Sequence, residues 1–293
     1  MLNRERIALK VLEEAGGRLP KTTFVKLVFL LRMETALKQN SSFYDFVPYK
    51  YGPYSFALYR DLYRLESHGY VSEADDSFAL NEKLLIEAQS QTKKLKRSLQ
   101  CAVVDIVERY GQMKLSPLIK DVYDRYRWYA LNSERSERRL FPMPFRPKAP
   151  VAVYTVGYEG KSVDAFFNYL LEKGIETIID VRANPISRKY GFSGSRMKQI
   201  GEYLGIEYQH FPSLGVASSE RANLRDNGSY TRLFNKYEQH ILAYRKQEVR
   251  EVGKYMQSWP SVLVCVEKDV TCCHRSRLAI AVARESRLRV THL

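Results

Sequence analysis

The stretch 262–280, VLVCVEKDVTCCHRSRLAI, places a buried strand, a polar turn and the start of a helix in direct succession. Residues 262–266 are apolar or small, which is typical of a strand covered on both faces. A charged turn with two cysteines follows, and a helix pattern begins at Arg275. Open α/β sheets bind ligands where a strand runs into a helix N-terminus, because unpaired N–H groups gather there. This turn is therefore the first candidate for a functional site.

The sequence around this stretch alternates between strand and helix patterns from residue 151 onward. Residues 151–156 and 176–181 are apolar runs that predict buried strands, with a helix pattern over 162–173 between them. Such a βαβ unit makes its two strands parallel. The predicted order continues with a helix over 194–204, a strand over 207–211, helices within 231–257, the strand of the opening stretch and an edge strand over 289–292. We therefore expect an α/β domain with a mainly parallel sheet over 151–293.

Polar residues follow three of these predicted strands, and the carboxyl ends of parallel strands meet at one edge of a sheet. The residues that we expect to converge there are Tyr158 after the first strand, Asp180, Arg182, Ser187 and Arg188 at the second, and Glu267, Lys268, Cys273, His274, Arg275 and Ser276 after the third.

These segments also carry a family resemblance. The motifs are TVGYEG over 155–160, IIDVR-x-x-P-x-SR-x-x-GFS over 178–193, and CVEKD-x-x-x-CHRS over 265–276. Together they resemble the family numbered 488 among domains of unknown function, over residues 153–293. The resemblance implies an α/β domain with the motifs around one site, and it implies no particular reaction. Tyr158 departs from the pattern, because a histidine is common at this position, and Cys272 is not part of it.

The N-terminal half has a different pattern. Helices are predicted over 4–15, from Lys21 and from Phe56, followed by two short strands near 70–71 and 78–80. Helix, helix, helix, hairpin is the order of a winged helix. The spacing Phe-x-Pro-x-x-x-Gly-Pro-x-Ser over 46–55 resembles the turn before the third helix of prokaryotic winged-helix and antitoxin-like proteins, over residues 4–80. We expect a mostly helical winged-helix-like domain with a helical extension over 1–131.

Residues 132–150 separate the two predicted domains. This stretch holds four prolines and no periodicity, so it predicts an extended and fairly stiff linker. In the preceding domain, Arg60 and Arg64 lie four residues apart on one face of the helix from Phe56. A helix face with basic and aromatic side chains suits phosphate contacts on nucleic acid, and a protein–protein docking face is the alternative.

The composition limits the classes of binding partner and the cellular compartment that we expect for the protein. The formal net charge is +14, with 26 Lys and Arg against 18 Asp and Glu in residues 1–150, and 21 against 15 in the rest. A charge excess spread over both halves favours a polyanionic partner, although a generally basic protein gives the same total. No run approaches the roughly 18 apolar residues of a membrane span. Four cysteines are too few for a disulfide framework. We expect a cytoplasmic protein with no membrane partner.

The spacing of the cysteines along the sequence argues against two kinds of cysteine chemistry. A thiol phosphatase or sulfurtransferase needs an arginine six positions after its cysteine, and no cysteine of this chain has one. Metal sites often hold two thiolates in a C-x-x-C turn, which is also lacking, so no metal or other cofactor is predicted. Cys265 is interpreted as a small buried strand residue.

An anion site remains. Its binding residues would be Tyr158, Arg182, Ser187, Arg188, Lys268, Arg275 and Ser276 in the C-terminal domain, with Arg60 and Arg64 in the N-terminal one. Asp180, Glu267, Cys273 and His274 are the candidates for acid–base and nucleophilic roles. The alternative for Asp180 and Glu267 is pairing with these arginines to hold the strand ends together.

The resulting hypothesis is a nucleic-acid-associated protein, with DNA preferred over RNA, that serves genome defence or repair. In it, the winged helix docks on nucleic acid and the α/β domain binds or processes a nucleotide or phosphodiester. Two alternatives stay open. One is an enzyme for a small phosphorylated or nucleotide metabolite, with the N-terminal half as a regulator or homodimer module. The other is a non-catalytic defence or antitoxin scaffold. Whether the protein is an enzyme is left open by the sequence.

Overall fold

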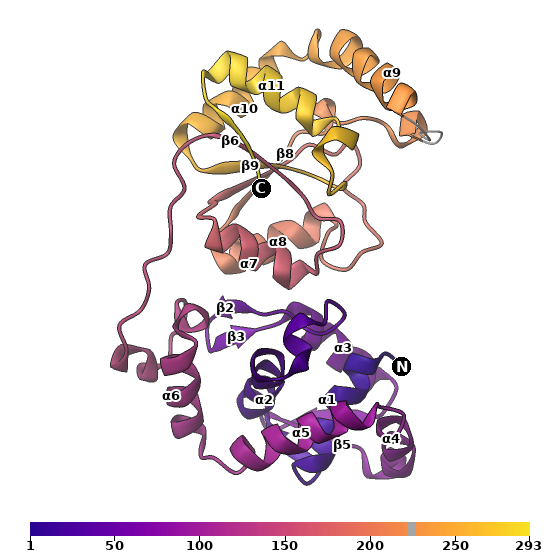
Figure 1. Ribbon diagram of the computed structural model, residues 1–293, viewed down its shortest axis with the longest axis vertical. Helices are drawn as coiled ribbons and strands as arrows, with labels where there is room; N and C mark the ends of the chain where they lie inside the picture. The colour runs from indigo at the N-terminus through magenta and orange to yellow at the C-terminus, as the bar shows by residue number, and fades with distance from the viewer. Residues whose placement is uncertain (222–226) are drawn as a thin grey trace. The chain divides into compact units, whose positions relative to one another are not determined.

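The structure, a computed structural model, describes residues 1–221 and 227–293. Within them the chain forms two compact units, Met1–Phe145 and Arg146–Leu293 (Figure 1). The boundary falls inside the stretch 132–150, and the part before it is folded rather than extended. A 3-10 helix, Ser136–Leu140, packs against helix α6 (Leu115–Arg125) there. All four prolines of the stretch lie from position 142 onward, so the residues before them are free to adopt helical turns.

The N-terminal unit combines helices with two small antiparallel sheets. Its helices include α1 (Asn3–Glu14), α2 (Lys21–Glu34), α3 (Phe56–Ser67), α4 (Leu85–Thr92), α5 (Arg97–Tyr110) and α6. Its strands are β1 (Arg18–Pro20), β2 (Val47–Tyr49), β3 (Gly52–Tyr54), β4 (Val71–Ala74) and β5 (Ser77–Leu80). One sheet has the order β1-β5-β4, and β2 pairs with β3. The expected hairpin is present as β4 and β5, whereas β1, β2 and β3 are too short to leave a period in the sequence.

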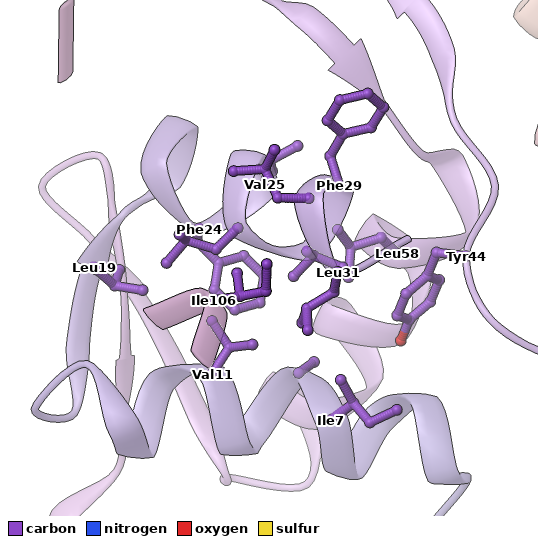
Figure 2. Close-up of a cluster of buried hydrophobic side chains, with 14 of the residues drawn as sticks. Ile7, Val11, Leu19, Phe24, Val25, Phe29, Leu31, Tyr44, Leu58 and Ile106 are labelled. Atoms are coloured by element: carbon purple, nitrogen blue, oxygen red, sulfur yellow. The ribbon is translucent and has the colours of Figure 1, made fainter. Parts of the chain in front are cut away.

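Helix α2 is the centre of this unit. Its segment 23–31, TFVKLVFLL, is buried at every position, because apolar residues surround the whole circumference of the helix. Figure 2 shows Phe24, Val25 and Phe29 of α2 in the core that Val11 of α1 and Ile106 of α5 help to build. Even this apolar helix has only 14 residues, and none of the described helices is long and apolar enough to cross a membrane.

The C-terminal unit is an α/β domain with a parallel sheet, as expected. Its strands are β6 (Val153–Gly157), β7 (Thr177–Asp180), β8 (Glu207–His210), β9 (Ser261–Cys265) and β10 (Val290–His292). They lie in the order β10-β6-β9-β7-β8, and every neighbouring pair is parallel. Its helices include α7 (Val163–Glu172), α8 (Gly194–Leu204), α9 (Asn227–Tyr237), α10 (Lys246–Ser258) and α11 (Arg275–Ser286).

The order of the strands creates a place for a ligand. Helices α7 and α8 cover one face of the sheet, and α10 and α11 cover the other (Figure 1). Strand β9 lies between β6 and β7, although β6 and β7 are consecutive along the chain. The chain therefore leaves β6 and β7 towards one face, and it leaves the intervening β9 towards the opposite face. Carboxyl ends of strands at such a switch point are where open α/β sheets bind ligands.

Candidate functional site

The structure brings six of the residues predicted at the strand ends into two groups, each of which also contains one residue that was not predicted there. The first, called here the Asp180–Arg182 cluster, consists of Tyr158, Asp180, Arg182 and Tyr208. The second, called the Cys273 cluster, consists of Cys265, Glu267, Cys273 and His274. Each group is built from loops that leave different strands, as expected for the carboxyl edge of a parallel sheet.

The Asp180–Arg182 cluster is sealed inside the unit. Arg182 is only 2% exposed and Asp180 is fully buried. The Arg182 guanidinium donates from Nε to Asp180 Oδ1 (2.8 Å) and from Nη1 to the Tyr158 hydroxyl (2.9 Å) and the Phe192 carbonyl (2.8 Å). Tyr208 donates its hydroxyl to Asp180 Oδ2 at 2.8 Å. The guanidinium is thus engaged by the protein itself.

The pKa values of this cluster agree with a closed ion pair. Burial disfavours the charge on Arg182, but the hydrogen bond and the charge of Asp180 outweigh it and raise the pKa of Arg182. Burial and the neighbouring Asp180 carboxylate also raise the pKa of Tyr208. The geometry therefore fits the alternative in which Asp180 and its arginine hold the strand ends together, and it leaves neither group facing a ligand.

Arg275 also acts on the protein backbone. It is 2% exposed, and it donates from Nη1 to the Glu267 carbonyl (2.6 Å) and from Nη2 to the Lys268 carbonyl (3.1 Å). Its Nε has no hydrogen-bond partner within the described residues. Arg275 was expected to bind phosphate, but its two terminal nitrogens instead fix the loop that carries Glu267. This loop is further held by Glu159, whose Oε2 accepts the Lys268 N–H at 3.0 Å.

Glycines let the loops approach closely enough to form the site. A Cβ at Gly157 would lie 1.8 Å from the Glu267 carbonyl oxygen, and one at Gly215 would lie 2.0 Å from the Ala183 nitrogen. Any side chain at these two positions would push the loops apart. The first glycine of the TVGYEG motif and Gly215 are therefore required sterically.

The Cys273 cluster joins the end of β9 to the start of α11. Cys265 is the last residue of β9, and Cys273 and His274 directly precede α11. The Sγ atoms of the two cysteines and a ring nitrogen of His274 all lie within 4.8 Å of one another. Glu267 extends the group, since its Oε2 accepts the Cys265 thiol at 3.4 Å.

The orientation of His274 is fixed by its neighbours. Its Nε2 lies 3.1 Å from the Val181 carbonyl oxygen, which can only accept a hydrogen bond, so Nε2 carries the proton. Nδ1 then presents a lone pair, and it lies 3.9 Å from Cys265 Sγ. The Tyr237 ring packs edge-on against the imidazole, with 5.3 Å between the ring centroids.

The environment of Cys273 favours a thiolate. Burial alone raises the pKa of the thiol, but hydrogen-bond interactions with Cys265 and His274 and the charge of Arg275 outweigh it, so the pKa lies well below the ordinary value. The start of α11 contributes in the same direction, since a helix N-terminus stabilises a nearby thiolate.

A pocket of about 150 Å³ gives access to this cluster. Glu267, Cys272, Cys273 and His274 line it. The other lining residues are Val216, Tyr230, Leu233 and Phe234. A larger depression of about 560 Å³ includes Thr177 and Glu207, which begin β7 and β8, and so lies at the opposite edge of the sheet. We place the candidate site at the smaller pocket, because the reactive groups line it.

The remaining predicted residues lie outside the two clusters. The Ser276 hydroxyl donates to the Cys273 carbonyl (2.8 Å), and the Ser187 hydroxyl accepts the Lys189 N–H (3.2 Å). Arg188 and Lys268 are exposed, so they are the predicted cations of this unit that remain accessible.

Arg60 and Arg64 belong to α3 in the N-terminal unit. Arg60 donates to the buried carboxylate of Asp61 (2.7 Å), and Arg64 lies 3.3 Å from Glu5. Both predicted nucleic-acid contacts are therefore already ion-paired within the unit.

Several residues of the pocket did not follow from the sequence. Cys265 was interpreted as a small buried strand residue, and it is buried, but its thiol faces His274. Tyr230 and Phe234 come from α9, about 30 residues earlier in the chain, and no motif marked them. The spacing of Cys265 at a strand end and Cys273 at a helix start would have been the usable signal, since a strand–turn–helix brings these ends together.

These features define the class: the C-terminal unit is a doubly wound α/β domain with one thiol–imidazole–carboxylate cluster at its switch point. Residues 162–282 match the family described as "Domain of unknown function DUF488". This match covers the chain from the start of α7 into α11, including every residue of the Cys273 cluster. Neither the curated proteins nor the solved structures contain a match to the chain.

Proposed function

We propose that the C-terminal unit is a hydrolytic enzyme domain that acts on a nucleotide or another small phosphate-bearing molecule. The observation that carries this proposal is the Cys273 cluster at the floor of a pocket at the switch point of the sheet. A thiol with a lowered pKa, an imidazole and a carboxylate seldom share one pocket for structural reasons alone, because burying them costs free energy.

The dimensions of the pocket support a small ligand. About 150 Å³ accommodates one ring or one phosphoryl group, less than the roughly 300 Å³ of a site that encloses a drug-sized molecule. The walls from Tyr230 and Phe234 suit the flat face of a base. Arg277 lies beside this wall, with its guanidinium 5.8 Å from the centroid of the Phe234 ring, and it is paired with Glu238 at 3.5 Å.

In this proposal the cluster supplies acid–base chemistry. Glu267 borders the pocket and accepts a proton from an attacking water. His274 Nδ1 keeps the neighbouring thiols in position. The water oxygen bonds to the electrophilic centre of the substrate, and the proton on Glu267 passes to the leaving group.

The test is turnover by the full chain on a panel of nucleoside mono-, di- and triphosphates and sugar phosphates, with products separated by chromatography. Glu267→Gln should lower kcat about 10²- to 10⁴-fold, the contribution of a general base. Glu251→Gln, on the exposed surface of α10, should stay within about twofold of the original chain. Unchanged turnover in Glu267→Gln, or no turnover on the whole panel, would contradict the proposal.

A second candidate is docking on nucleic acid by the N-terminal unit. Its support is the net charge of +6 in residues 1–145, from 24 Lys and Arg against 18 Asp and Glu, and the order α1, β1, α2, β2, β3, α3, β4, β5, which resembles that of a winged helix apart from β2 and β3. The hairpin instead carries Glu73 within β4 and Asp75 and Asp76 at its turn, and such charges repel phosphates.

An electrophoretic mobility shift of the full chain with duplex DNA, single-stranded DNA and RNA decides between these arguments. Binding that weakens steeply as salt rises would support the second candidate. If all three nucleic acids fail to bind at low salt, the second candidate is rejected.

A further inference from the structure

The geometry points to a Zn²⁺ site formed by Cys265, Cys273 and His274, with the fourth coordination position facing the pocket. The three ligand atoms are already within 4.8 Å of one another, although no motif of paired cysteines is present. Two thiolates and one imidazole form a borderline-soft donor set that suits Zn²⁺ and does not suit Mg²⁺ or Ca²⁺.

The second argument is the hydrogen bond made by the ring nitrogen of His274 that would not bind the metal. A metal-bound histidine almost always donates its other ring N–H to a carbonyl or carboxylate, which fixes the tautomer and the ring orientation. His274 has this arrangement, since Nε2 donates to the Val181 carbonyl at 3.1 Å. Nδ1 therefore points its lone pair into the space beside Cys265 Sγ, 3.9 Å away.

The third argument is that the ligands stand on rigid parts of the fold. Cys265 ends a strand that is buried at each of its residues, and His274 is the N-cap of α11. Arg275 clamps the carbonyls of Glu267 and Lys268, which holds the intervening loop. All three ligands are at most 3% exposed. A preformed site of this kind loses little conformational entropy when an ion binds.

The position of the cluster distinguishes a catalytic site from a structural one. Structural zinc sites use four protein ligands, whereas catalytic ones use three and leave a position for water or substrate. Here Cys265 lies behind the pocket, while Cys273 and His274 line it. Glu267 lines it too, beside the three ligands, which is where zinc deaminases and hydrolases place their acid–base glutamate. The catalytic part of this inference rests on the proposed hydrolytic function.

A Zn²⁺ ion at this site would supply the nucleophile as a bound water, so the proposed hydrolysis would not require a nucleophilic side chain. Zn²⁺ lowers the pKa of a bound water towards neutrality. Glu267 takes the proton, the hydroxide oxygen bonds to the substrate, and the same proton returns to the leaving group, so neither an oxidant nor a reductant is required.

The test starts from the full chain, stripped with a chelator and reconstituted with Zn²⁺ or Co²⁺. We expect about one ion per chain by elemental analysis. The cobalt form should show thiolate-to-metal charge transfer and the intense visible bands of four-coordinate Co²⁺. Cys265→Ser, Cys273→Ser and His274→Ala should each bind the ion at least about 100-fold more weakly. Cys272→Ser is the matched control, because it borders the same pocket but lies outside the three-atom group, and it should keep full metal content.

A second measurement covers variants that fail to fold. In the unaltered chain, Zn²⁺ should slow the alkylation of Cys265 and Cys273 relative to the stripped chain, as read by peptide mass spectrometry, while the rates of Cys101 and Cys272 stay the same with and without the ion. Absence of stoichiometric binding, or equal protection of all four cysteines, would overturn the site, and a disulfide between Cys265 and Cys273 would appear in the same spectra. Metal binding without turnover would leave the site standing and reject the proposed function. Turnover by the stripped chain would support the proposed function and reject a catalytic role for the ion.

Discussion

The Asp180–Arg182 cluster and the Cys273 cluster lie at the same edge of one sheet, yet they differ in access. The Arg182 guanidinium is bonded to Asp180, Tyr158 and the Phe192 carbonyl. It lies 5.3 Å from the centroid of the Tyr158 ring, which stacks on the Phe192 ring. The Cys273 cluster is as deeply buried, but three of its members line a pocket. Charge at a strand end therefore indicates function only where the group is both reactive and reachable.

The largest expected effect comes from breaking the closed cluster. Arg182→Leu leaves the Asp180 carboxylate buried without its counter-charge, so we expect the C-terminal unit to lose about 3–5 kcal/mol of unfolding free energy. Denaturant unfolding followed by the fluorescence of Trp259, in a Trp128→Phe background, reports on this unit alone.

Two controls sharpen this result. Arg188→Ala removes an exposed arginine from the same segment and should change stability by less than about 0.5 kcal/mol. Asp180→Leu combined with Arg182→Leu removes both charges and should be more stable than Arg182→Leu alone. If the double substitution proves the less stable of the two, an unpaired carboxylate is not what destabilises the single variant.

Lys26 in the N-terminal unit can be compared with Arg182, because both are buried cations. Unlike Arg182, Lys26 has no carboxylate partner among the described residues. Its Nζ donates to the Tyr51 carbonyl at 2.6 Å, and burial together with the charge of Arg135 lowers its pKa to about 7. Arg182 has Asp180 beside it, and its pKa is raised instead. Between pH 7 and about pH 10 the unfolded chain holds a proton on Lys26 that the folded unit lacks.

The unfolding free energy of the N-terminal unit should therefore rise with pH in this interval, by up to about 1.4 kcal/mol per pH unit. Below pH 7 both states carry the proton, so this contribution becomes constant. Lys26→Met should flatten the profile between pH 7 and about pH 9.5, before tyrosines titrate. Unfolding followed by the fluorescence of Trp128, in a Trp259→Phe background, measures the profile. An equally steep profile in Lys26→Met would refute the assignment.

The fold of the C-terminal unit could be predicted because its strands are buried on both faces. The segments that form β6, β7 and β9 are buried at every position and mostly apolar, apart from Asp180 at the end of β7, and each is followed by a helix pattern. The insertion of β9 between β6 and β7 could not be predicted, since nothing in an apolar run specifies its neighbours. In the N-terminal unit, β1 has three residues and forms only through pairing with β5, so no local pattern marks it.

For the site, the sequence predicts which loops converge but not which side chains remain accessible. Arg182 and Arg275 look like phosphate ligands by residue type, yet their donors reach carboxylate or carbonyl oxygens within a few residues of themselves. Such short-range bonds depend on rotamers and loop geometry. The absence of a C-x-x-C motif likewise argues against a metal only if both thiolates belong to one turn, whereas here a strand end supplies Cys265.

The smallest of these effects is steric and tests how the Cys273 cluster is held. Gly157→Ala would place a methyl group 1.8 Å from the Glu267 carbonyl oxygen, so the loop that Arg275 clamps must move. We expect a loss of about 1–3 kcal/mol in the unfolding free energy of the C-terminal unit. We also expect weaker Co²⁺ binding, because Glu267 and Cys273 belong to the same loop.

Gly253→Ala is the matched substitution in α10, where a new methyl group meets only ordinary contact, 3.5 Å from Ser286 Cβ. An alanine inside a helix should leave stability unchanged or raise it by up to about 1 kcal/mol. Comparing the two variants separates the effect of replacing a glycine from the effect of displacing the loop. If Gly157→Ala destabilises the unit but keeps full Co²⁺ affinity, the loop moves without the ligands, and the site depends on β9 and α11 alone.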